Sequence, residues 1–393
     1  MLKKRLKSYD YSILVVFLLV SIFGLIMVYS ASMVTAIQIY GKSSTYFFYR
    51  QLINLLIAIV AFVFAAIIPY KKLKSTSFIQ LIFFGSIVVL IFVLFMGSNV
   101  NNATSWLKVG VRNIQPAEFV KLGTIIYLSA VYSKKQPYIN NFNKGVIPPI
   151  VFLVFVTFLI VLQPDLGTAS IVFLTGMLIV FCSGMNWKNL GRLFVLGAII
   201  IAIFSPLILW KHDEIFTTER MGRLYSFKDP FKYEMDEGLQ LVNSYLALGS
   251  GGWNGEGLGK SIQKLGFLPE AHTDFIMAII AEELGIFGVA FVIISLGYLI
   301  LKGFYIGMKS KDSFGSLLAF GISGMIGIQV SINLGGVSGM IPVTGVTLPF
   351  ISYGGSSLFI LSLSMGLLMN ISSYANLEHK TNKTRAIENI KSR

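Results

Sequence analysis

The chain has 393 residues, of which 55% are hydrophobic and 13% are charged. A soluble domain carries about 25% charged residues, so soluble domains of this total length could not cover their surfaces with so few charges. The composition therefore indicates a polytopic membrane protein. The single cysteine excludes a disulfide scaffold and a cysteine-based metal site. The three histidines are far apart in sequence, which argues against a multi-histidine site.

Apolar runs of about 20 residues recur along the chain, and each is close to the length that crosses a hydrocarbon core of about 30 Å. The first run follows a basic N-terminus, as in a signal peptide, but it is long and nine more follow, so we expect it to remain uncleaved. We predict an all-α protein with about ten transmembrane helices. The spans cover roughly residues 11–33, 47–68, 77–96, 116–133, 145–163, 167–185, 192–210, 274–301, 313–333 and 353–373.

The lysines and arginines indicate the orientation of these spans. If the N-terminus is cytoplasmic, most of the 32 Lys and Arg residues fall in the two terminal segments and the inner loops, while the short outer loops are nearly free of them. This is the distribution that the positive-inside rule describes, so we predict that both termini are cytoplasmic. The basic inner surface would then face anionic lipid, and we expect no nucleic-acid partner in spite of the net charge of +14.

One long outer loop, at about residues 211–273, separates the seventh span from the eighth. It holds half of the 18 acidic residues together with several aromatic ones. A loop of this length in a compact protein is usually functional or disordered, and we expect short helices lying on the outer membrane surface. We interpret residues 1–375 as one integral-membrane domain and residues 376–393 as a basic cytoplasmic tail.

The motif PEAHTDF opens the eighth span and contains the strongest candidate for a catalytic residue. Thr273 or Asp274 could simply cap the helix. However, His272 and a glutamate crowd the same point, and a carboxylate beside the apolar Phe275 at a membrane boundary is partly desolvated. Desolvation raises the pKa of a carboxyl group towards the range of a general base. Asp274 is therefore a candidate base facing the outer aqueous boundary.

Four charged residues lie deep within apolar spans, where a charge normally faces protein or water and has a partner. Glu118 and Lys121 are three residues apart and can pair along one helix face. Glu282 and Glu283 are adjacent in the eighth span, so they cannot both face one partner. We predict structural ion pairs for all four, with a direct functional role as the alternative.

Two further polar groups are expected at the outer boundary. The motif QPDLG, with Gln163 and Asp165, breaks the fifth span from the sixth, either as a tight turn with Asp165 as a helix cap or as a polar wall of an outward-facing cavity. Trp106, Lys108 and Arg112 precede the fourth span. Trp106 is typical of an interfacial anchor, and the two cations could equally hold a phosphate.

Two glycine-rich segments and one arginine complete the candidates. Arg223, in the acid-rich outer loop, could form surface ion pairs or a bidentate phosphate contact. The run from Ser250 to Ser261 fails the Walker pattern at Asn254, and no strand precedes it, so a flexible turn or lid is expected. The run NLGGVSGMIPVTGVTLPFISYGGSS, from residue 333 to 357, could mark a substrate site in a broken membrane segment or close helix packing through small residues.

This last run resembles the signature of the SEDS family (shape, elongation, division and sporulation), and other motifs agree with it. LPEAHTDFIMAIIAEELG is similar to a second family hallmark, and Trp106 with the turn QPAE and Lys121 is similar to a third. Two positions of the third differ, because Ser105 replaces the usual Arg and Ala117 the usual Ser. QPDLGT and the pairing of Arg223 with an Asp-Pro step are further similarities, so the resemblance covers nearly the whole chain.

The resemblance implies a ten-helix peptidoglycan glycosyltransferase that polymerises lipid II on the outer face of the bacterial cytoplasmic membrane. It implies a class B penicillin-binding protein and other divisome membrane proteins as partners, and Asp274 as the essential carboxylate. The motifs YSAS at residues 29–32 and LPEAHTDF are more similar to those of division members than to those of elongation members, so we expect a septal location. The matching motifs suggest substrate-binding roles for Trp106, Lys108, Arg112, Lys121, Gln163, Asp165, Arg223, His272, Ser352, Gly354 and Ser356.

In the expected reaction, Asp274 takes a proton from the acceptor sugar's 4-hydroxyl, which attacks the anomeric carbon of the growing chain with inversion. Arg223, Lys108, Arg112 or a divalent cation could stabilise the pyrophosphate leaving group. Because few acids cluster in sequence, Mg²⁺ or Mn²⁺ would bind through phosphate and one or two carboxylates, at ligands that the sequence does not assign. A lipid II flippase and a non-catalytic divisome scaffold are the alternatives, and an elongation-type polymerase is the alternative within the family.

Overall fold

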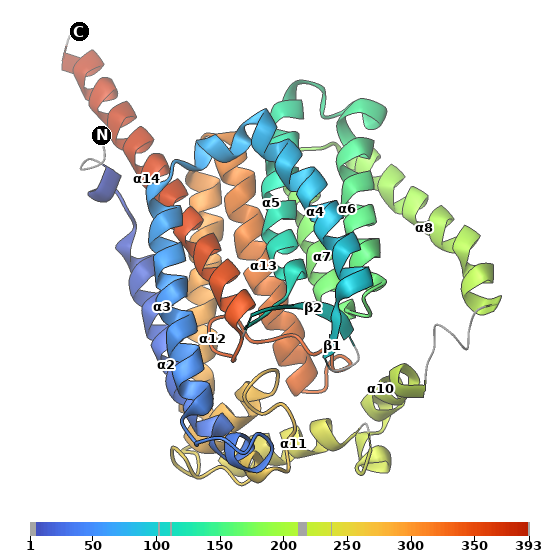
Figure 1. Cartoon of the computed structure of the whole chain (residues 1–393). Coiled ribbons are helices and arrows are strands. Elements are labelled where there is room, and N and C mark those ends of the chain that lie inside the picture. Colours follow the sequence, from blue (N-terminus) through green and yellow to red (C-terminus); the bar gives the residue numbers. More distant parts are fainter. Residues whose placement is uncertain (1–4, 101–102, 111, 211–217, 237, 392–393) are drawn as a thin grey trace.

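The computed structural model describes residues 5–100, 103–110, 112–210, 218–236 and 238–391, which are mostly helical. Within these ranges every predicted span corresponds to a helix (Figure 1). The helices are α2 (Tyr11–Gln38), α3 (Tyr46–Ile67), α4 (Thr76–Met96), α5 (Pro116–Lys135), α6 (Ile147–Val161), α7 (Leu166–Cys182), α8 (Trp187–Trp210), α12 (Ile276–Lys309), α13 (Ser313–Val337) and α14 (Gly355–Lys391).

Hydropathy and length explain most of these elements. Among the described residues, seven helices are long and apolar enough to cross a membrane, counting α6 with the π-helical turn at Phe142–Val146 that precedes it. The helix α7 is apolar but shorter, and α5 carries the predicted charged residues Glu118 and Lys121. The predicted class, a helical polytopic membrane protein, is confirmed.

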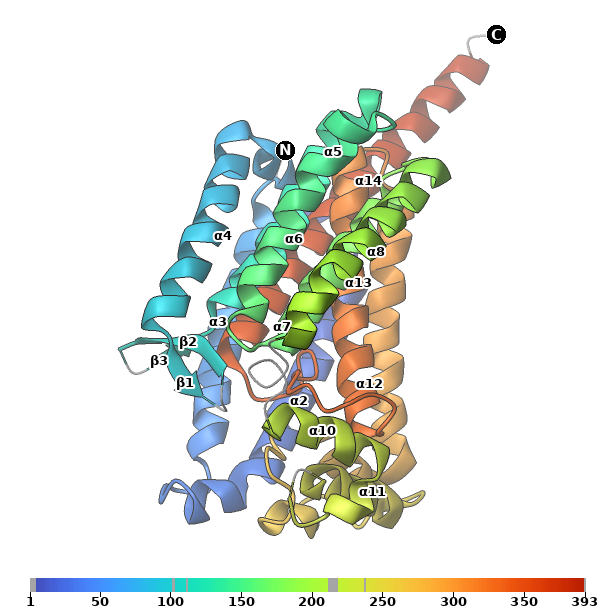
Figure 2. The same cartoon turned by 90° about the vertical axis from the view of Figure 1, so that its right-hand side faces the viewer.

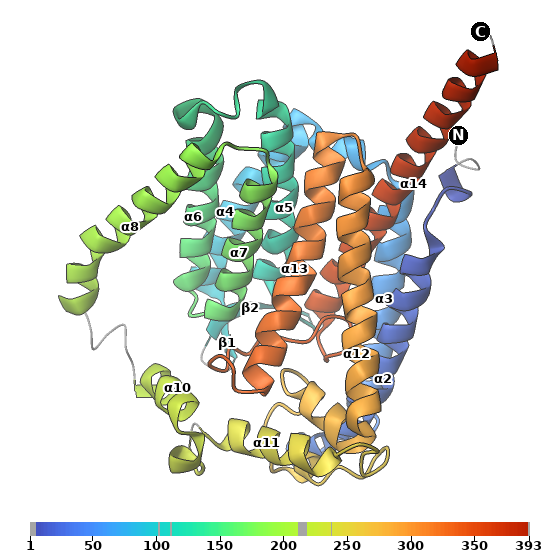
Figure 3. The same ribbon diagram turned by 180° about the vertical axis from the view of Figure 1, so that it is seen from behind.

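Both termini lie at one end of the helical bundle, and the long loop lies at the other (Figures 1 and 3). This opposite end is called the outer end below, after the predicted orientation. The loop forms the expected short helices, α10 (Thr218–Lys228) and α11 (Leu239–Gly251), with the 3-10 turns Pro230–Tyr233 and Gln263–Leu265. The helix α8 leans away from the other helices as it approaches this end.

A small antiparallel sheet at the outer end was not predicted. Its strands, β1 (Ser98–Val100), β2 (Ala103–Val109) and β3 (Arg112–Ile114), are arranged in the order β1-β2-β3 between α4 and α5 (Figure 2). Leu107 pairs with Ile114 and Val109 with Arg112, and Gly110 has a left-handed φ of 60° at the turn that joins the two strands. The sheet carries three of the predicted site residues, Trp106 and Lys108 in β2 and Arg112 in β3.

The helix α12 differs from the straight span that hydropathy predicts. It contains a break at Gly285, where φ is 59° and ψ is −153°. A short helical arm at residues 276–284 therefore precedes a longer arm at residues 286–309. Only glycine adopts this conformation without strain, so a single residue inside an apolar run changes the direction of the chain.

Close packing at the centre of the bundle depends on small residues. The ring of Phe17 in α2 stacks on Phe62 in α3, with 5.1 Å between centroids, and meets the edge of Phe350 at 5.5 Å. Gly24 in α2 faces the backbone of Phe350 and Ile351, in the segment that leads into α14. Small residues allow backbones in a membrane to approach in this way.

We expect Gly24→Val to destabilise the protein, because the first atom of the new side chain would lie 2.6 Å from Ile351 Cα and 2.8 Å from the Phe350 carbonyl oxygen. Overpacking of this kind costs about 1–3 kcal/mol. The matched control is Gly85→Val in α4, where nothing lies within 4 Å of the added atom. Thermal unfolding in detergent should show a lower midpoint for Gly24→Val alone, and equal midpoints would contradict the packing argument.

Candidate functional site

Asp274 is half-buried at the outer end and precedes the short arm of α12. Phe275 occupies the N-cap position without a side-chain cap bond, so neither Thr273 nor Asp274 caps this helix. The Thr273 hydroxyl instead donates to the carboxylate of Glu270 at 2.5 Å. Gly345, with φ of 70°, faces the Asp274 carboxylate, since a Cβ atom there would lie 3.6 Å from Oδ2. The absence of a side chain at residue 345 leaves room beside this oxygen.

The backbone before α12 is held by three consecutive carbonyl groups. The His272 carbonyl accepts a hydrogen bond from the Tyr353 N–H at 3.0 Å, and the Thr273 carbonyl accepts one from the Ser352 hydroxyl at 2.5 Å. The Asp274 carbonyl accepts one from the Asn333 side-chain amide at 2.7 Å. The glycine-rich motif at residues 333–357 therefore positions the backbone of the candidate base.

The helix α3 extends this network. The Gln51 side chain donates to the Ser352 carbonyl at 3.2 Å and accepts from the Gly354 N–H at 3.5 Å. The Ser352 hydroxyl, which donates to Thr273, also accepts from the Leu348 N–H at 2.8 Å. Ser352 and Gly354, expected to bind substrate, therefore have hydrogen-bonding groups committed to holding residues 272–274 and α3 together.

A second polar cluster joins the ends of three helices. Asp165 caps α7 by accepting from the Thr168 N–H at 3.0 Å, and its other oxygen accepts from the Gln115 side chain at 2.8 Å. The Gln115 N–H donates to the Ser356 hydroxyl at 3.2 Å. Gly167 packs on Thr344 in the glycine-rich motif. Asp165 thus serves both as the predicted cap and as part of a polar group that brings α5, α7 and α14 together.

Gln163 lies immediately before this turn but is fully buried. Its side-chain amide donates to the Leu90 carbonyl in α4 at 3.1 Å. Among the described residues its Oε1 atom has no hydrogen-bond partner. Gln163 links α4 to the turn between α6 and α7.

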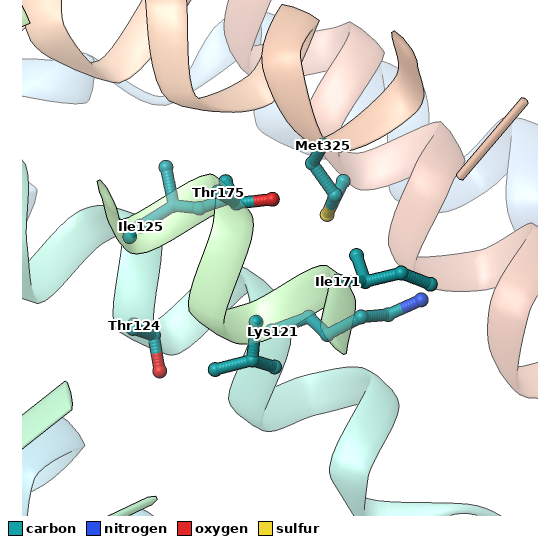
Figure 4. Close-up of a pocket in the computed structure, with 8 residues that line it drawn as sticks. Lys121, Thr124, Ile125, Ile171, Thr175 and Met325 are labelled. Atoms are coloured by element: carbon teal, nitrogen blue, oxygen red, sulfur yellow. The ribbon is translucent and has the colours of Figure 1, made fainter. Parts of the chain in front are cut away.

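The predicted pair in the fourth span is confirmed. Lys121 Nζ lies 2.8 Å from Glu118 Oε1, and both side chains are buried. Lys121 also donates to the Gln329 side chain at 3.2 Å, and Gln329 donates to the Thr347 carbonyl at 3.0 Å. A narrow gap with no space for a water molecule lies beside this lysine between α5, α7 and α13, with Thr124, Thr175 and Met325 in its lining (Figure 4).

The two carboxylates in the eighth span have partners in the outer loop. Glu283 forms an ion pair with Lys264 at 2.6 Å. A structural ion pair was predicted for this residue, but its partner was not. Glu282 differs, because it accepts hydrogen bonds from the Ser261 hydroxyl and from the Ile262 N–H, the latter at 2.8 Å. The prediction that they face different partners is confirmed. The glycine-rich run at residues 250–261 is attached to α12, unlike the flexible lid that we expected.

Trp106 and the three predicted cations belong to the small sheet and the outer loop. Trp106 is partly buried and Lys108 is exposed on β2. Arg112 lies in β3, paired through its backbone with Val109, and Arg223 lies in α10. The side chains of Arg112 and Arg223 fall outside the described residues, so their phosphate contacts stay predictions.

Arg50 was missed by sequence reasoning. It lies one turn inside α3, is exposed, and places its guanidinium 4.6 Å from the centre of the Tyr46 ring. It also lies beside the side chain of Tyr353, the residue whose N–H binds the His272 carbonyl. A single arginine within an apolar span is itself a signal of function, and this signal could have identified Arg50.

His272 is buried, with its ring 4.6 Å from that of Phe47 and 5.7 Å from that of Tyr353. Burial lowers the pKa of His272, against the opposing effect of Glu270. The imidazole is therefore neutral near pH 7 and does not supply a positive charge to a substrate phosphate. Its contacts indicate a packing role beneath the segment that carries Asp274.

Within the described ranges no cluster of three or more His, Cys, Asp or Glu side chains could hold a metal ion. Mg²⁺ commonly binds through one or two carboxylates and substrate phosphate oxygens. The half-buried Asp274 carboxylate fits the first part of such a site. The Asp165 carboxylate already accepts from Thr168 and Gln115.

The chain is similar to one protein family, to named relatives within it and to solved structures. The model of the FtsW/RodA/SpoVE family, described as cell cycle protein, matches residues 10–377. The probable peptidoglycan glycosyltransferase FtsW of Bacillus subtilis (strain 168) is 54% identical over 383 residues, which cover 98% of this chain and 95% of that protein. Stage V sporulation protein E of the same organism is 38% identical over 94% of this chain and 98% of its own.

Solved structures share the fold. A chain of a peptidoglycan synthase complex, studied for the coordination of polymerization and crosslinking, matches with a TM-score of 0.73 and 24% identity over 94% of this chain and 98% of that one. The Rod shape determining protein RodA of Thermus thermophilus matches with a TM-score of 0.64 and 25% identity, over 93% and 97% of the two chains.

We expect the stability of the protein to fall as the pH drops below about 6.5, the ordinary pKa of histidine. The pKa of His272 is lowered in the folded state, so the unfolded chain binds an additional proton in this range. One such proton contributes a slope of about 1.4 kcal/mol per pH unit. Thermal unfolding between pH 5 and 8 should show a shallower dependence in His272→Phe, which keeps an aromatic ring.

The control is His379→Gln, at an exposed position in α14. This variant should keep the steeper pH dependence of the parent protein. An unchanged slope in His272→Phe would show that another group causes the acid sensitivity.

Proposed function

The chain belongs to the FtsW/RodA/SpoVE family and is a peptidoglycan glycosyltransferase of the FtsW type, and from this premise we propose that it polymerises lipid II with Asp274 as the general base. The observation that carries the proposal is the set of three hydrogen-bonded carbonyls at residues 272–274, which fixes one half-buried carboxylate at the outer end. A positioned base of this kind accelerates proton transfer by about 10²–10⁴-fold.

The reaction joins two lipid-linked sugars. Asp274 removes the proton from the acceptor's 4-hydroxyl, and the oxygen forms a bond with the anomeric carbon of the donor. The bond between that carbon and the pyrophosphate oxygen breaks, and undecaprenyl pyrophosphate leaves with the electron pair. Attack from the opposite face converts an α-linked donor into a β-linked product.

Negative charge develops on the pyrophosphate as it leaves, and fixed cations near it lower the barrier. Arg50 is a described cation that lies beside Tyr353, whose N–H binds the His272 carbonyl. A Mg²⁺ or Mn²⁺ ion, bound by Asp274 and substrate phosphate, would supply further charge neutralisation. Lys108, Arg112 and Arg223 are additional candidates for the more distant phosphate.

The cellular setting is part of the proposal. We propose a septal location, a class B penicillin-binding protein that cross-links the product, and contacts with other divisome membrane proteins. The higher identity to FtsW than to the sporulation protein supports the division role. Glu118 and Lys121 pair with each other and are buried, which favours an enzyme over a flippase with an open polar path.

We expect Asp274→Asn to abolish glycan polymerisation, with a loss of about 10²–10⁴-fold, because the amide cannot accept the proton. The measurement is a gel assay of glycan ladders from lipid II, with a divalent cation and a matching class B penicillin-binding protein. Asp236→Asn, at an exposed position of the outer loop, is the matched control. Full polymerisation by Asp274→Asn, in protein shown to be folded, would disprove the assigned role.

We expect Arg50→Ala to lower kcat by about 10²-fold, the usual effect of removing one group that stabilises transition-state charge. Arg50→Lys should retain part of the rate, because it keeps a cation without the planar hydrogen-bonding geometry. Lys42→Ala, an exposed cation in the loop before α3, serves as the control. Equal rates for Arg50→Ala and Lys42→Ala would exclude Arg50 from leaving-group stabilisation.

A further inference from the structure

The break in α12 leaves the short arm, residues 276–284, without a continuous helix to fix its direction. Asp274 lies at the N-terminal end of this arm, and Gly285 lies at its C-terminal end. A helix that ends leaves its last carbonyl groups without partners inside the helix. In a membrane protein these groups must be satisfied by other elements.

The glycine-rich loop supplies these partners. The Glu256 N–H donates to the Glu282 carbonyl at 2.9 Å, and the Gly257 N–H donates to the Glu283 carbonyl at 3.0 Å. On the other side of the break, the Ile286 N–H donates to the Trp253 carbonyl at 3.2 Å. The loop therefore binds both sides of the interruption through its backbone.

The close approach of this loop requires glycine. A Cβ atom at Gly251 would collide with the Ala281 carbonyl, and one at Gly255 would collide with the Glu283 carbonyl. Gly255 also has a left-handed φ of 73°. The glycines in this run thus serve backbone contact with α12.

A buried ion pair strengthens the same attachment. Lys264 Nζ lies 2.6 Å from Glu283 Oε1 and donates to the Ser30 hydroxyl in α2 at 2.9 Å. The Ser30 hydroxyl donates to Glu283 at 2.7 Å. Lys264 is 3% exposed and Glu283 is fully buried, so the charged groups are enclosed between the loop, α2 and the short arm.

We propose that residues 251–257 and 261–264, here named the loop clamp, fix the short arm of α12 so that Asp274 is held in its reactive position, with Lys264 as a positioning residue. The inference rests on the proposed role of Asp274 as the base. The clamp holds the C-terminal end of the arm, while Asn333, Ser352 and Tyr353 hold its N-terminal end.

Lever geometry explains why the clamp matters for the rate. The arm is about 13 Å long at about 1.5 Å per residue, so a tilt of about 5° at Gly285 displaces its far end by about 1 Å. A displacement of about 1 Å at a reacting group can lower the rate by about 10²-fold. Substrate contacts made by other elements would change little, so the effect belongs in kcat and not in KM.

The ion pair in the clamp indicates that the clamp specifies one position of the short arm. A buried ion pair is not generally more stabilising than apolar residues of similar volume, and its best-attested use is to specify one arrangement. Lys264 and Glu283 also share the Ser30 hydroxyl, which defines the position of the arm relative to α2. An apolar contact would allow the arm to slide.

The test compares four variants of the whole chain. Two are the single variants Lys264→Met and Lys264→Arg. The third is a double variant that combines Lys264→Met with Glu283→Gln, and the control is Lys260→Met. Lys260 is exposed and lies outside the clamp. Two quantities are measured for each variant: amide hydrogen exchange across residues 270–284, and kcat and KM for lipid II per folded molecule.

We expect Lys264→Met to accelerate exchange across residues 270–284 and to lower kcat by about 10–100-fold with little change in KM. Lys264→Arg should recover most of both properties, and Lys260→Met should match the parent protein. The double variant has no uncompensated buried charge, yet it should keep the low kcat because the loop has lost the attachment to Ser30 and the short arm that Lys264 makes.

Recovery of kcat in the double variant would overturn the proposal, since the defect of Lys264→Met would then arise from an unpaired buried carboxylate. Unchanged exchange in Lys264→Met would also overturn it. Exchange is measured without substrate, so it tests the clamp even if Asp274→Asn keeps full activity and the assigned catalytic role fails.

Discussion

Three consecutive backbone carbonyls, at residues 272–274, determine how the rest of the outer end is arranged. Each accepts a hydrogen bond from a different residue, and these donors come from α13 and from the segment that leads into α14. A non-helical backbone segment at a membrane boundary must have its polar groups satisfied by protein or water. The same bonds that satisfy this requirement hold the backbone of Asp274 in place. They therefore also position its carboxylate for the proposed reaction.

Several charged and amide side chains buried in the bundle are joined to a neighbour that also organises the backbone. Lys121 bridges Glu118 and Gln329, and Gln329 in turn holds the Thr347 carbonyl. Asp165 caps α7 while it accepts from Gln115. Charges and amides in the apolar bundle thus connect helix ends to the glycine-rich motif, where side-chain packing alone would leave the irregular backbone without support.

The spans could be predicted because hydropathy is a local property of about 20 residues. The pair of Glu118 and Lys121 could be predicted for the same reason, since helical spacing brings the two together. The partner of Glu283 could not, because Lys264 and Ser30 reach it only through the folded loop and α2. The break at Gly285 could not be predicted either, because an apolar run with one glycine is compatible with a straight helix. The contacts on both sides of the break come from residues 253–257, which are distant in sequence.

The length of α14 has a mechanical consequence. This helix begins at Gly355, next to the residue that bonds Gln51, and continues without proline to Lys391 at the opposite end of the molecule. Sharp bends in helices arise mainly at proline, glycine-serine pairs or inserted groups. A rod of about 1.5 Å per residue therefore joins the polar network at the outer end directly to the side where the termini lie, and an axial shift at one end is transmitted to the other without a joint to absorb it.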